Sequence, residues 1–258
     1  MNFEPSVTKL RIFRALHTGP NLLVLPNAWD AASARCFQAA GFPAIATSSG
    51  AVAQTLGYGD HEQAPVEEML AAAARIVRAV SVPVTVDFEA GYGLPPSEIA
   101  RRLIDIGAVG LNLEDTDHRA GVLVPPEAHA ERLGAVKSEA RRHGADLFLN
   151  ARVDVFVRSD GDSGTRVADA LRRGRLYREA GADCVYPIAL ADNEVVRELV
   201  AALEIVNVLL GPAGSLTLDA ARAAGARRGT FGTRLFRDTM AALDAIAAEI
   251  HGATSVAK

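Results

Sequence analysis

The stretch "VPVTVDFEAGYGLPPSEIARRLIDIGAVGLNLED" spans residues 82–115 and contains one complete strand–helix–strand unit. Its first segment, Val82–Asp87, has the length and the β-branched content of a buried strand. Pro96–Ile106 follows a glycine-containing loop, starts with proline and stops at Gly107, as helices commonly do. Val109–Leu113 then begins a second apolar strand. A helix between two such strands favours a parallel pair with a right-handed crossover.

The same unit recurs along the chain. We expect strands at residues 21–25, 43–47, 82–87, 109–113, 146–151, 183–187, 205–210 and 228–231. We expect a helix after each strand, at residues 31–40, 66–80, 96–106, 126–142, 165–180, 192–203, 216–224 and 234–250. Eight units in about 250 residues predict an α/β fold, a (β/α)₈ TIM barrel. A doubly wound open sheet is the alternative, but no GxGxxG turn follows the first strand.

The composition bounds the domain organisation and the classes of partner. The 258 residues are 49% hydrophobic and 22% charged, with a formal net charge of −4. We predict a single domain over residues 1–258 with a flexible tail at 251–258. No basic surface suggests nucleic-acid binding, and no apolar run reaches the length of about 18 residues that a membrane span needs. The N-terminus lacks a signal-peptide core, so we expect a cytoplasmic protein with two reduced cysteines.

Acidic side chains cluster where neighbouring strands end. Asp87 and Glu89 are two apart, so in an extended chain they face one side, and Phe88 between them faces the helices. Glu114 ends the adjacent strand, and Asp60 lies in the loop after the second strand. A barrel carries its chemistry on these loops, so we expect the carboxylates to share one mouth.

Like charges that are buried together repel, unless one is protonated or a cation is present. Oxygen ligands without His or Cys at metal spacing favour Mg²⁺, with Mn²⁺ as the usual substitute. The sequence therefore predicts a metal site of Asp60, Asp87, Glu89 and Glu114. Any one of these residues, taken alone, could instead be a helix cap or a surface acid.

Three other segments could bind a substrate. Ser48-Ser49-Gly50 follows a strand, and successive N–H groups at such a turn can hold a carboxylate. A plain strand-to-helix turn would use the same residues. Arg152 interrupts an apolar stretch, either to clamp an anion or to pair with the acidic cluster. Trp29 either lines the pocket or packs the mouth of the barrel.

Four motifs together resemble the isocitrate lyase / phosphoenolpyruvate mutase superfamily. They are "SSGAVAQTLGYGD" at 48–60, "VPVTVDFEAGYG" at 82–93, "GLNLED" at 110–115 and "NARVD" at 150–154. The resemblance extends from residue 26 to 240. It implies a (β/α)₈ barrel that binds Mg²⁺ and an α-oxo carboxylate or its enolate. It also implies a homotetramer, a dimer of dimers, in which the last helix exchanges between subunits.

The resemblance assigns roles to the candidate residues. Asp87 would bind the metal directly, and three other acids would hold the metal's waters: Asp60, Glu89 and Glu114. Ser48, Ser49 and Gly50 would bind the substrate carboxylate through their backbone, and Arg152 would contact the substrate.

One loop departs from the family pattern. Isocitrate and methylisocitrate lyases carry a K-K-C-G-H segment after the fourth strand, whereas this chain has Asp115–Val122 without a cysteine. The lysine of the phosphorus–carbon bond enzymes is missing as well. His118 and Arg119 are the remaining catalytic candidates, because His118 has a suitable intrinsic pKa. A solvent-exposed loop histidine is the alternative interpretation.

Three functions remain open on the sequence. The first is a Mg²⁺-dependent lyase that breaks a C–C bond in a small oxo or hydroxy acid, with oxaloacetate decarboxylation as the simplest case. The second is a P–C bond enzyme: phosphonopyruvate hydrolase, phosphoenolpyruvate mutase or carboxyphosphonoenolpyruvate mutase. The third is a barrel that binds an α-oxo acid with little turnover.

Overall fold

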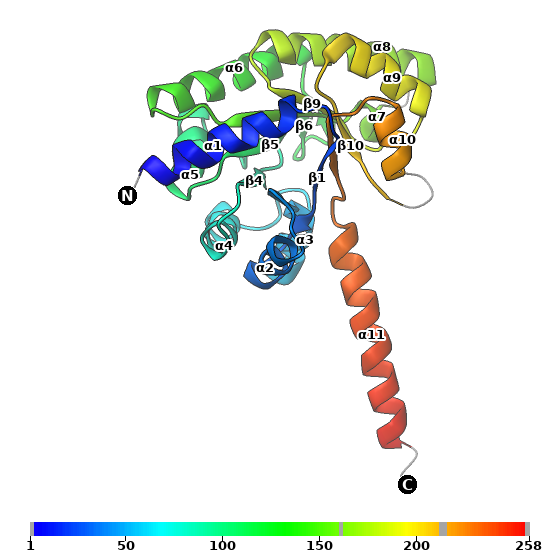
Figure 1. The fold of residues 1–258 in the computed structure, drawn as a ribbon. Helices are drawn as coiled ribbons and strands as arrows, with labels where there is room; N and C mark the ends of the chain where they lie inside the picture. The colour runs from blue at the N-terminus through cyan, green and yellow to red at the C-terminus, as the bar shows by residue number, and fades with distance from the viewer. Residues whose placement is uncertain (1–2, 160–161, 212–215, 256–258) are drawn as a thin grey trace.

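A ring of parallel strands surrounded by helices forms the body of the molecule (Figure 1). The structure is a computed structural model and describes residues 3–159, 162–211 and 216–255. The strands of the ring are β1 (Leu23–Leu25), β2 (Asn27–Ala28), β3 (Ile45–Thr47), β4 (Val84–Asp87), β5 (Gly110–Glu114), β8 (Phe148–Val153), β9 (Cys184–Pro187), β10 (Asn207–Leu209) and β11 (Arg228–Thr230).

Strand pairing closes the ring. One sheet has the order β2-β3-β4-β5-β8-β9, and the other has the order β1-β11-β10. A bridge between Val185 and Val206 joins β9 to the segment before β10. β1 and β2 are separated only by Pro26, whose missing N–H interrupts the hydrogen-bond ladder. The predicted α/β fold is confirmed, and its pairing is that of a TIM-barrel-like ring.

Each expected helix has a counterpart in the structure. These helices are α2 (Ala31–Ala39), α4 (Val66–Ala79), α5 (Pro96–Asp105), α6 (Pro126–Arg142), α8 (Ser163–Glu179), α9 (Asn193–Leu203), α10 (Leu218–Ala223) and α11 (Arg234–Ser255). Their boundaries lie within a few residues of the expected ones, except at the end of α11. That helix continues to Ser255, so the tail expected to begin at residue 251 is helical there, and residues 256–258 lie outside the described residues.

Several elements were not expected from the sequence. They are α1 (Phe3–Thr18), α3 (Ser49–Thr55), α7 (Val155–Arg158) and the hairpin of β6 (Thr116–Asp117) with β7 (Val122–Leu123). In α1, Phe13 and His17 pack on the ring of Phe148, with centroids 5.2 and 4.0 Å away. Arg14 of α1 pairs with Asp183 at 2.7 Å. Both contacts lie at the amino end of a strand. α1 therefore closes the end of the barrel opposite the carboxyl ends of the strands.

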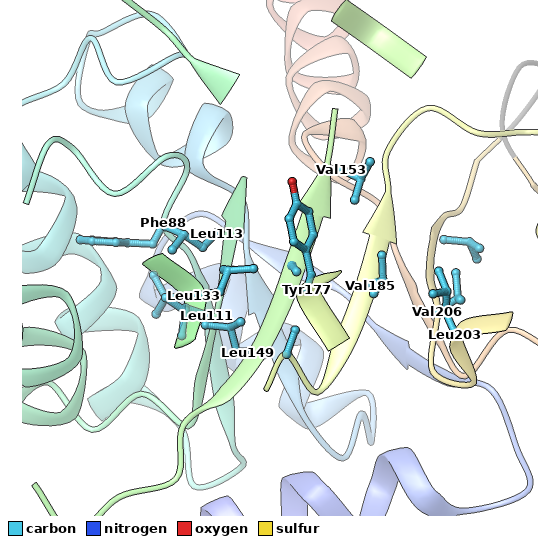
Figure 2. Close-up of a cluster of buried hydrophobic side chains, with 14 of the residues drawn as sticks. Phe88, Leu111, Leu113, Leu133, Leu149, Val153, Tyr177, Val185, Leu203 and Val206 are labelled. Atoms are coloured by element: carbon cyan, nitrogen blue, oxygen red, sulfur yellow. The ribbon is translucent and has the colours of Figure 1, made fainter. Parts of the chain in front are cut away.

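The largest cluster of buried apolar side chains lies between the strands and the outer helices (Figure 2). Phe88, just after β4, is 1% exposed and belongs to this cluster with Leu113 of β5 and Leu133 of α6. The expectation that Phe88 faces the helices is confirmed. Burying a side chain of this size contributes about 1.5–3 kcal/mol, which anchors the end of β4 beside the site.

α11 extends away from the barrel (Figure 1). It exposes four large apolar side chains with exposed fractions of 38, 52, 53 and 61%, at Met240, Leu243, Ile246 and Ile250. Within the described residues, no helix has the length and apolar character needed to cross a membrane.

Candidate active site

A cavity of about 240 Å³ opens at the carboxyl ends of the barrel strands. Its wall contains six of the residues that the sequence singled out: Ser48, Ser49, Gly50, Asp60, Asp87 and Arg152. They come from three different strand ends and one loop, as expected for a barrel mouth. A volume of this size admits a small organic acid.

Other residues of the wall were missed by the sequence analysis. They include His61, Asn112, Tyr186, Thr233 and Arg237. Asn112 carried a usable signal, because it is a polar residue inside the apolar strand β5. His61 follows Asp60 directly and could have been considered with it. Arg237 lies on α11, and no local pattern distinguishes it from Arg234, the other arginine of that helix.

The start of α3 presents hydrogen-bond donors to a carboxylate. Ser48 has extended backbone angles and caps the helix, since its Oγ accepts the N–H of Ala51 at 3.4 Å. Ser49 donates from its N–H and from its Oγ to Asp87 Oδ2, at 3.1 and 2.7 Å. In this structure the carboxylate that these donors hold therefore belongs to Asp87.

Gly50 makes room for Asp60. A Cβ atom at Gly50 would lie 2.6 Å from Asp60 Oδ2 and 2.9 Å from Thr233 Cγ2. Contacts this short do not occur with real side chains, so any larger residue would displace its neighbours. The absence of a side chain at Gly50 thus places a carboxylate and the start of α11 against the cavity.

Asp60 and Asp87 are the two carboxylates of the cavity wall. Asp87 Oδ1 accepts the side-chain amide of Asn112 at 3.2 Å. The Oδ1 atom of Asn112 in turn accepts from Asn150 at 2.8 Å and from the buried Arg228 at 3.2 Å. Neither aspartate forms an ion pair with any lysine or arginine of the described residues. Two oxygen donors without a cationic partner suit a hard divalent cation such as Mg²⁺.

Glu89 does not line this cavity, although Asp87 does. β4 ends at Asp87, and Glu89 has a positive φ of 47°. The expectation that both carboxylates leave one face of an extended strand is therefore wrong. Glu89 accepts the N–H of Glu62 at 2.7 Å and the hydroxyl of Tyr92. Burial raises the pKa of Glu89 to about 7.

Glu114 is also absent from the cavity wall, and is held by two neighbours. Parallel pairing puts Glu114 opposite Arg152, and the two form an ion pair. His118 Nε2 lies 2.5 Å from the Oε1 atom of Glu114. Burial of the Glu114 side chain, which is 1% exposed, raises its pKa.

Arg152 pairs with the acidic cluster and also reaches the cavity. Its Nε and Nη2 atoms donate to Asp154 at 2.7 and 3.1 Å, in addition to the pair with Glu114. Burial acts to lower the pKa of Arg152, but the charges of Glu114 and Asp154 outweigh it and raise this pKa. The ion-pair interpretation is thus confirmed, and Arg152 still lines the wall.

His118 and Arg119 lie beside the main cavity. They line two adjoining cavities of about 250 and 240 Å³, and His61 lines both the main cavity and the first of these. The His118 side chain is only 4% exposed, so the solvent-exposed interpretation is wrong. Arg119 is exposed. Sequence spacing did not reveal the burial of His118, because it depends on the β6–β7 hairpin.

Trp29 does not line the cavity wall. Its ring contacts Phe37 at a centroid distance of 6.3 Å and Phe236 of α11 at 5.5 Å. The expectation that Trp29 binds substrate is not supported by this position. The alternative, that it packs the mouth of the barrel, agrees with these contacts.

Comparison with known proteins identifies the family of the chain. The phosphoenolpyruvate phosphomutase family matches residues 13–251. An uncharacterized protein of Mycobacterium tuberculosis (strain ATCC 25618 / H37Rv) is 35% identical over 188 residues, which cover 72% of this chain and 69% of the relative. The 2-methylisocitrate lyase of Bacillus subtilis (strain 168) is 32% identical over 192 residues, which cover 70% of this chain and 60% of that enzyme.

Two solved structures share the fold over almost the whole chain. A candidate phosphonomutase of Burkholderia cenocepacia J2315 is 37% identical with a TM-score of 0.86, covering 93% of this chain and 99% of the other. Oxaloacetate acetylhydrolase in complex with oxalate is 25% identical with a TM-score of 0.84, covering 95% and 87%. The resemblance seen in the sequence motifs is thereby confirmed. The chain belongs to the isocitrate lyase / phosphoenolpyruvate mutase superfamily, whose members include lyases that act on small carboxylates.

Proposed function

We propose that this protein is a Mg²⁺-dependent lyase that cleaves or decarboxylates a small α-oxo or hydroxy carboxylate of the oxaloacetate type. One observation carries the proposal: a single cavity combines two aspartates, Asp60 and Asp87, that form no ion pair within the described residues, with donors for a carboxylate at Ser49 and Arg152. The relatives that bear names of this kind, 2-methylisocitrate lyase and oxaloacetate acetylhydrolase, support it.

In this proposal, Asp87 binds Mg²⁺ directly, and Asp60, Glu89 and Glu114 hold its waters. The ion supplies Lewis-acid chemistry, since it stabilises the negative charge that develops when the bond next to the oxo group breaks. Asn112 orients Asp87 through the hydrogen bond at 3.2 Å. The role of Ser49 then changes, because its two donors, which hold Asp87 in this structure, become available to a substrate carboxylate.

The substrate is oriented by the wall of the cavity. Ser48, Ser49 and Gly50 bind its carboxylate through the start of α3, and Arg152 contacts the same end of the molecule. Holding the acid in one orientation lowers the barrier by reducing the entropy lost on reaction.

His118 is the proposed proton donor, with Arg119 as a cationic neighbour in the same hairpin. Burial acts to lower the pKa of His118, but the hydrogen bond and charge of Glu114 outweigh it and raise this pKa above its ordinary value. A histidine that keeps its proton near neutral pH can transfer it to the enolate carbon.

A phosphonate substrate is the second candidate. Arg237 is a second arginine of the cavity wall in addition to Arg152, and an additional cation suits a phosphonate dianion. The loop at Asp115–Val122 lacks the lysine of the known P–C bond enzymes, so we rank this candidate second.

Product analysis tests the proposal. The purified protein is incubated with Mg²⁺ and, separately, with oxaloacetate, phosphonopyruvate and methylisocitrate, while pyruvate and phosphate are measured. We expect pyruvate without phosphate from oxaloacetate, above the rate with Mg²⁺ alone. Phosphate release from phosphonopyruvate would favour the second candidate, and binding without turnover would indicate an α-oxo acid-binding barrel.

Asp87→Ala is the central variant, with Asp219→Ala on the exposed surface of α10 as its matched control. We expect Asp87→Ala to lose Mg²⁺-dependent turnover and Asp219→Ala to keep it. Full Mg²⁺-dependent activity in Asp87→Ala would contradict the site assignment.

We also propose a homotetramer, a dimer of dimers, in which α11 exchanges between subunits. The exposed apolar residues of α11 support this, since such a surface is unfavourable in water. Sedimentation analysis should give a tetramer mass for the wild type and a smaller mass for Leu243→Glu. A monomeric wild type would contradict the assembly.

A further inference from the structure

Three potential metal ligands meet beside the main cavity. His61 lies between α3 and α4, Glu89 follows β4, and His118 follows β5. One ligand atom from each lies within 4.8 Å of the other two. The three loops follow three consecutive strands of the barrel, so their ends are neighbours in space. Residues far apart in the sequence therefore converge on one point.

His118 has the environment of a metal-binding histidine. Its Nε2 atom is engaged with Glu114 at 2.5 Å, and its side chain is 4% exposed. Its Nδ1 atom is buried and has no hydrogen-bond partner among the described residues. Metal-binding histidines usually bond a carboxylate through one ring nitrogen and the ion through the other. The pair of Glu114 and His118 matches this pattern and leaves Nδ1 for the ion.

Glu89 is held by two hydrogen bonds and can still bind a cation. The N–H of Glu62 and the hydroxyl of Tyr92 each donate to one of its two oxygens. Tyr92 also donates its N–H to the side chain of Glu62 at 2.5 Å, so the loops after β3 and β4 are linked twice. A carboxylate can accept about four hydrogen bonds, so lone pairs remain on Glu89 for a cation.

His61 is brought to the cluster by an unusual backbone. His61 and Glu62 both have positive φ, 68° and 58°. Non-glycine residues rarely adopt this strained conformation, and it is kept where the surroundings or the function require it. Here it places the His61 ring 5.0 Å from the His118 ring. The exposure of His61 gives an ion a route to the site from solvent.

We propose that His61, Glu89 and His118 form a second metal site, which takes a divalent first-row transition ion of the Zn²⁺ type. Two imidazoles and one carboxylate are ligands of such ions rather than of Mg²⁺, which prefers oxygen. Three protein ligands leave a coordination position open, as in catalytic zinc sites. The ion would join the loops after β3, β4 and β5. If the proposed function is correct, it would also withdraw Glu89 from the waters of Mg²⁺ and His118 from proton transfer, and so inhibit the Mg²⁺-dependent reaction.

Metal titration of the chelator-treated full-length protein tests this site. Zn²⁺ affinity is measured by calorimetry, and Co²⁺ is added separately because its visible absorption reports its ligands. We expect one tight Zn²⁺ per chain. His61→Ala should weaken binding by about 100-fold or more, since even changing a group that supports a ligand costs roughly 10–100-fold. Tyr92→Phe, which removes one support of Glu89, should weaken it by about 10-fold.

Two controls separate this site from the proposed Mg²⁺ site. His143→Ala removes an exposed histidine at the end of α6 and should leave Zn²⁺ binding unchanged. Asp87→Ala should abolish Mg²⁺-dependent turnover and keep Zn²⁺ binding. Wild-type Zn²⁺ affinity and Co²⁺ spectrum in His61→Ala would overturn the inference, as would loss of Zn²⁺ binding in Asp87→Ala. Zn²⁺ binding through His61 in a protein without any turnover would refute only the proposed function.

Discussion

Arg152→Met removes a guanidinium that pairs with two buried carboxylates, Glu114 and Asp154, in the barrel mouth. Methionine keeps an unbranched chain of similar length, so the change acts mainly on charge. Arg152 is 13% exposed, and its partners Glu114 and Asp154 are each 1% exposed. Loss of Arg152 leaves Asp154 without a cationic partner among the described residues, while Glu114 keeps its pair with His118.

The expected loss of stability follows from this burial. Removing one partner of a buried ion pair costs about 3–5 kcal/mol, because the remaining charge is uncompensated. For a chain of this size, that corresponds to a decrease of about 6–20 °C in Tm. Arg197→Met is the matched control, since Arg197 and its partner Glu194 are 46 and 82% exposed. An exposed pair contributes about 0–1 kcal/mol.

The loss should also depend on pH. Burial raises the pKa of Glu114 in the folded protein, and removing Arg152 raises it further, because the guanidinium charge lowers it. A carboxyl whose folded pKa exceeds its unfolded pKa is neutral in the fold at low pH, and its favourable contribution is lost as pH rises through the folded value. The penalty of Arg152→Met should therefore be larger at pH 8 than at pH 5.

Urea unfolding of the wild type and both variants at pH 5 and pH 8 measures these differences. If the free energy of unfolding falls no more in Arg152→Met than in Arg197→Met, the claim that Arg152 compensates buried charge is refuted. If it falls equally at both pH values, the cause is packing and not electrostatics.

Three further predictions concern single positions. Gly50→Ala should raise the Mg²⁺ dissociation constant measured by calorimetry about 10-fold or more, because its Cβ would lie 2.6 Å from Asp60 Oδ2; an unchanged constant would exclude Asp60 from the metal site. Burial lowers the pKa of His17 to about 3, below the 6.5 of an unfolded imidazole, so the unfolded state binds the proton first and stability should fall as pH drops from 6.5 toward 3. In His17→Phe, the free energy of unfolding measured with urea should depend less on pH between pH 6.5 and pH 3. The same pH dependence as in the wild type would contradict the lowered pKa of His17. Lys137→Met should cost about 3–5 kcal/mol in urea unfolding, since Lys137 is 2% exposed and pairs with Asp183 at 2.8 Å; Mg²⁺ binding should be unaffected, because this pair lies at the opposite end of the barrel.

The order of strands and helices could be read from local patterns. Apolar runs, helical periodicity and glycines that end helices depend on nearest neighbours along the chain, so they appear in the sequence itself. The elements that were missed depend on distant contacts. α1 is held by Phe148 and Asp183, and the β6–β7 hairpin lies over buried Glu114 and Asp154.

The residues of the cavity were also largely visible in the sequence. Parallel strands put their carboxyl ends on one side of a barrel, so polar residues such as Ser49, Asp87 and Arg152 could be assigned to the mouth once the strands were located. Arg237 could not, because α11 reaches the cavity only through the closure of the ring between β11 and β1.

Local sequence patterns show that acids end several adjacent strands, and hence that the barrel mouth is rich in carboxylate oxygen. Which of these acids face the cavity depends on contacts made only in the folded chain. A positive φ turns Glu89 toward Tyr92, and strand register places Glu114 against Arg152, so Asp60 and Asp87 are left on the wall. Positive φ at His61 and the β6–β7 hairpin around His118 bring these two residues to Glu89. The direction of a side chain at the end of a strand depends on the backbone angles of one or two residues and on the partners across the sheet, and local sequence patterns specify neither.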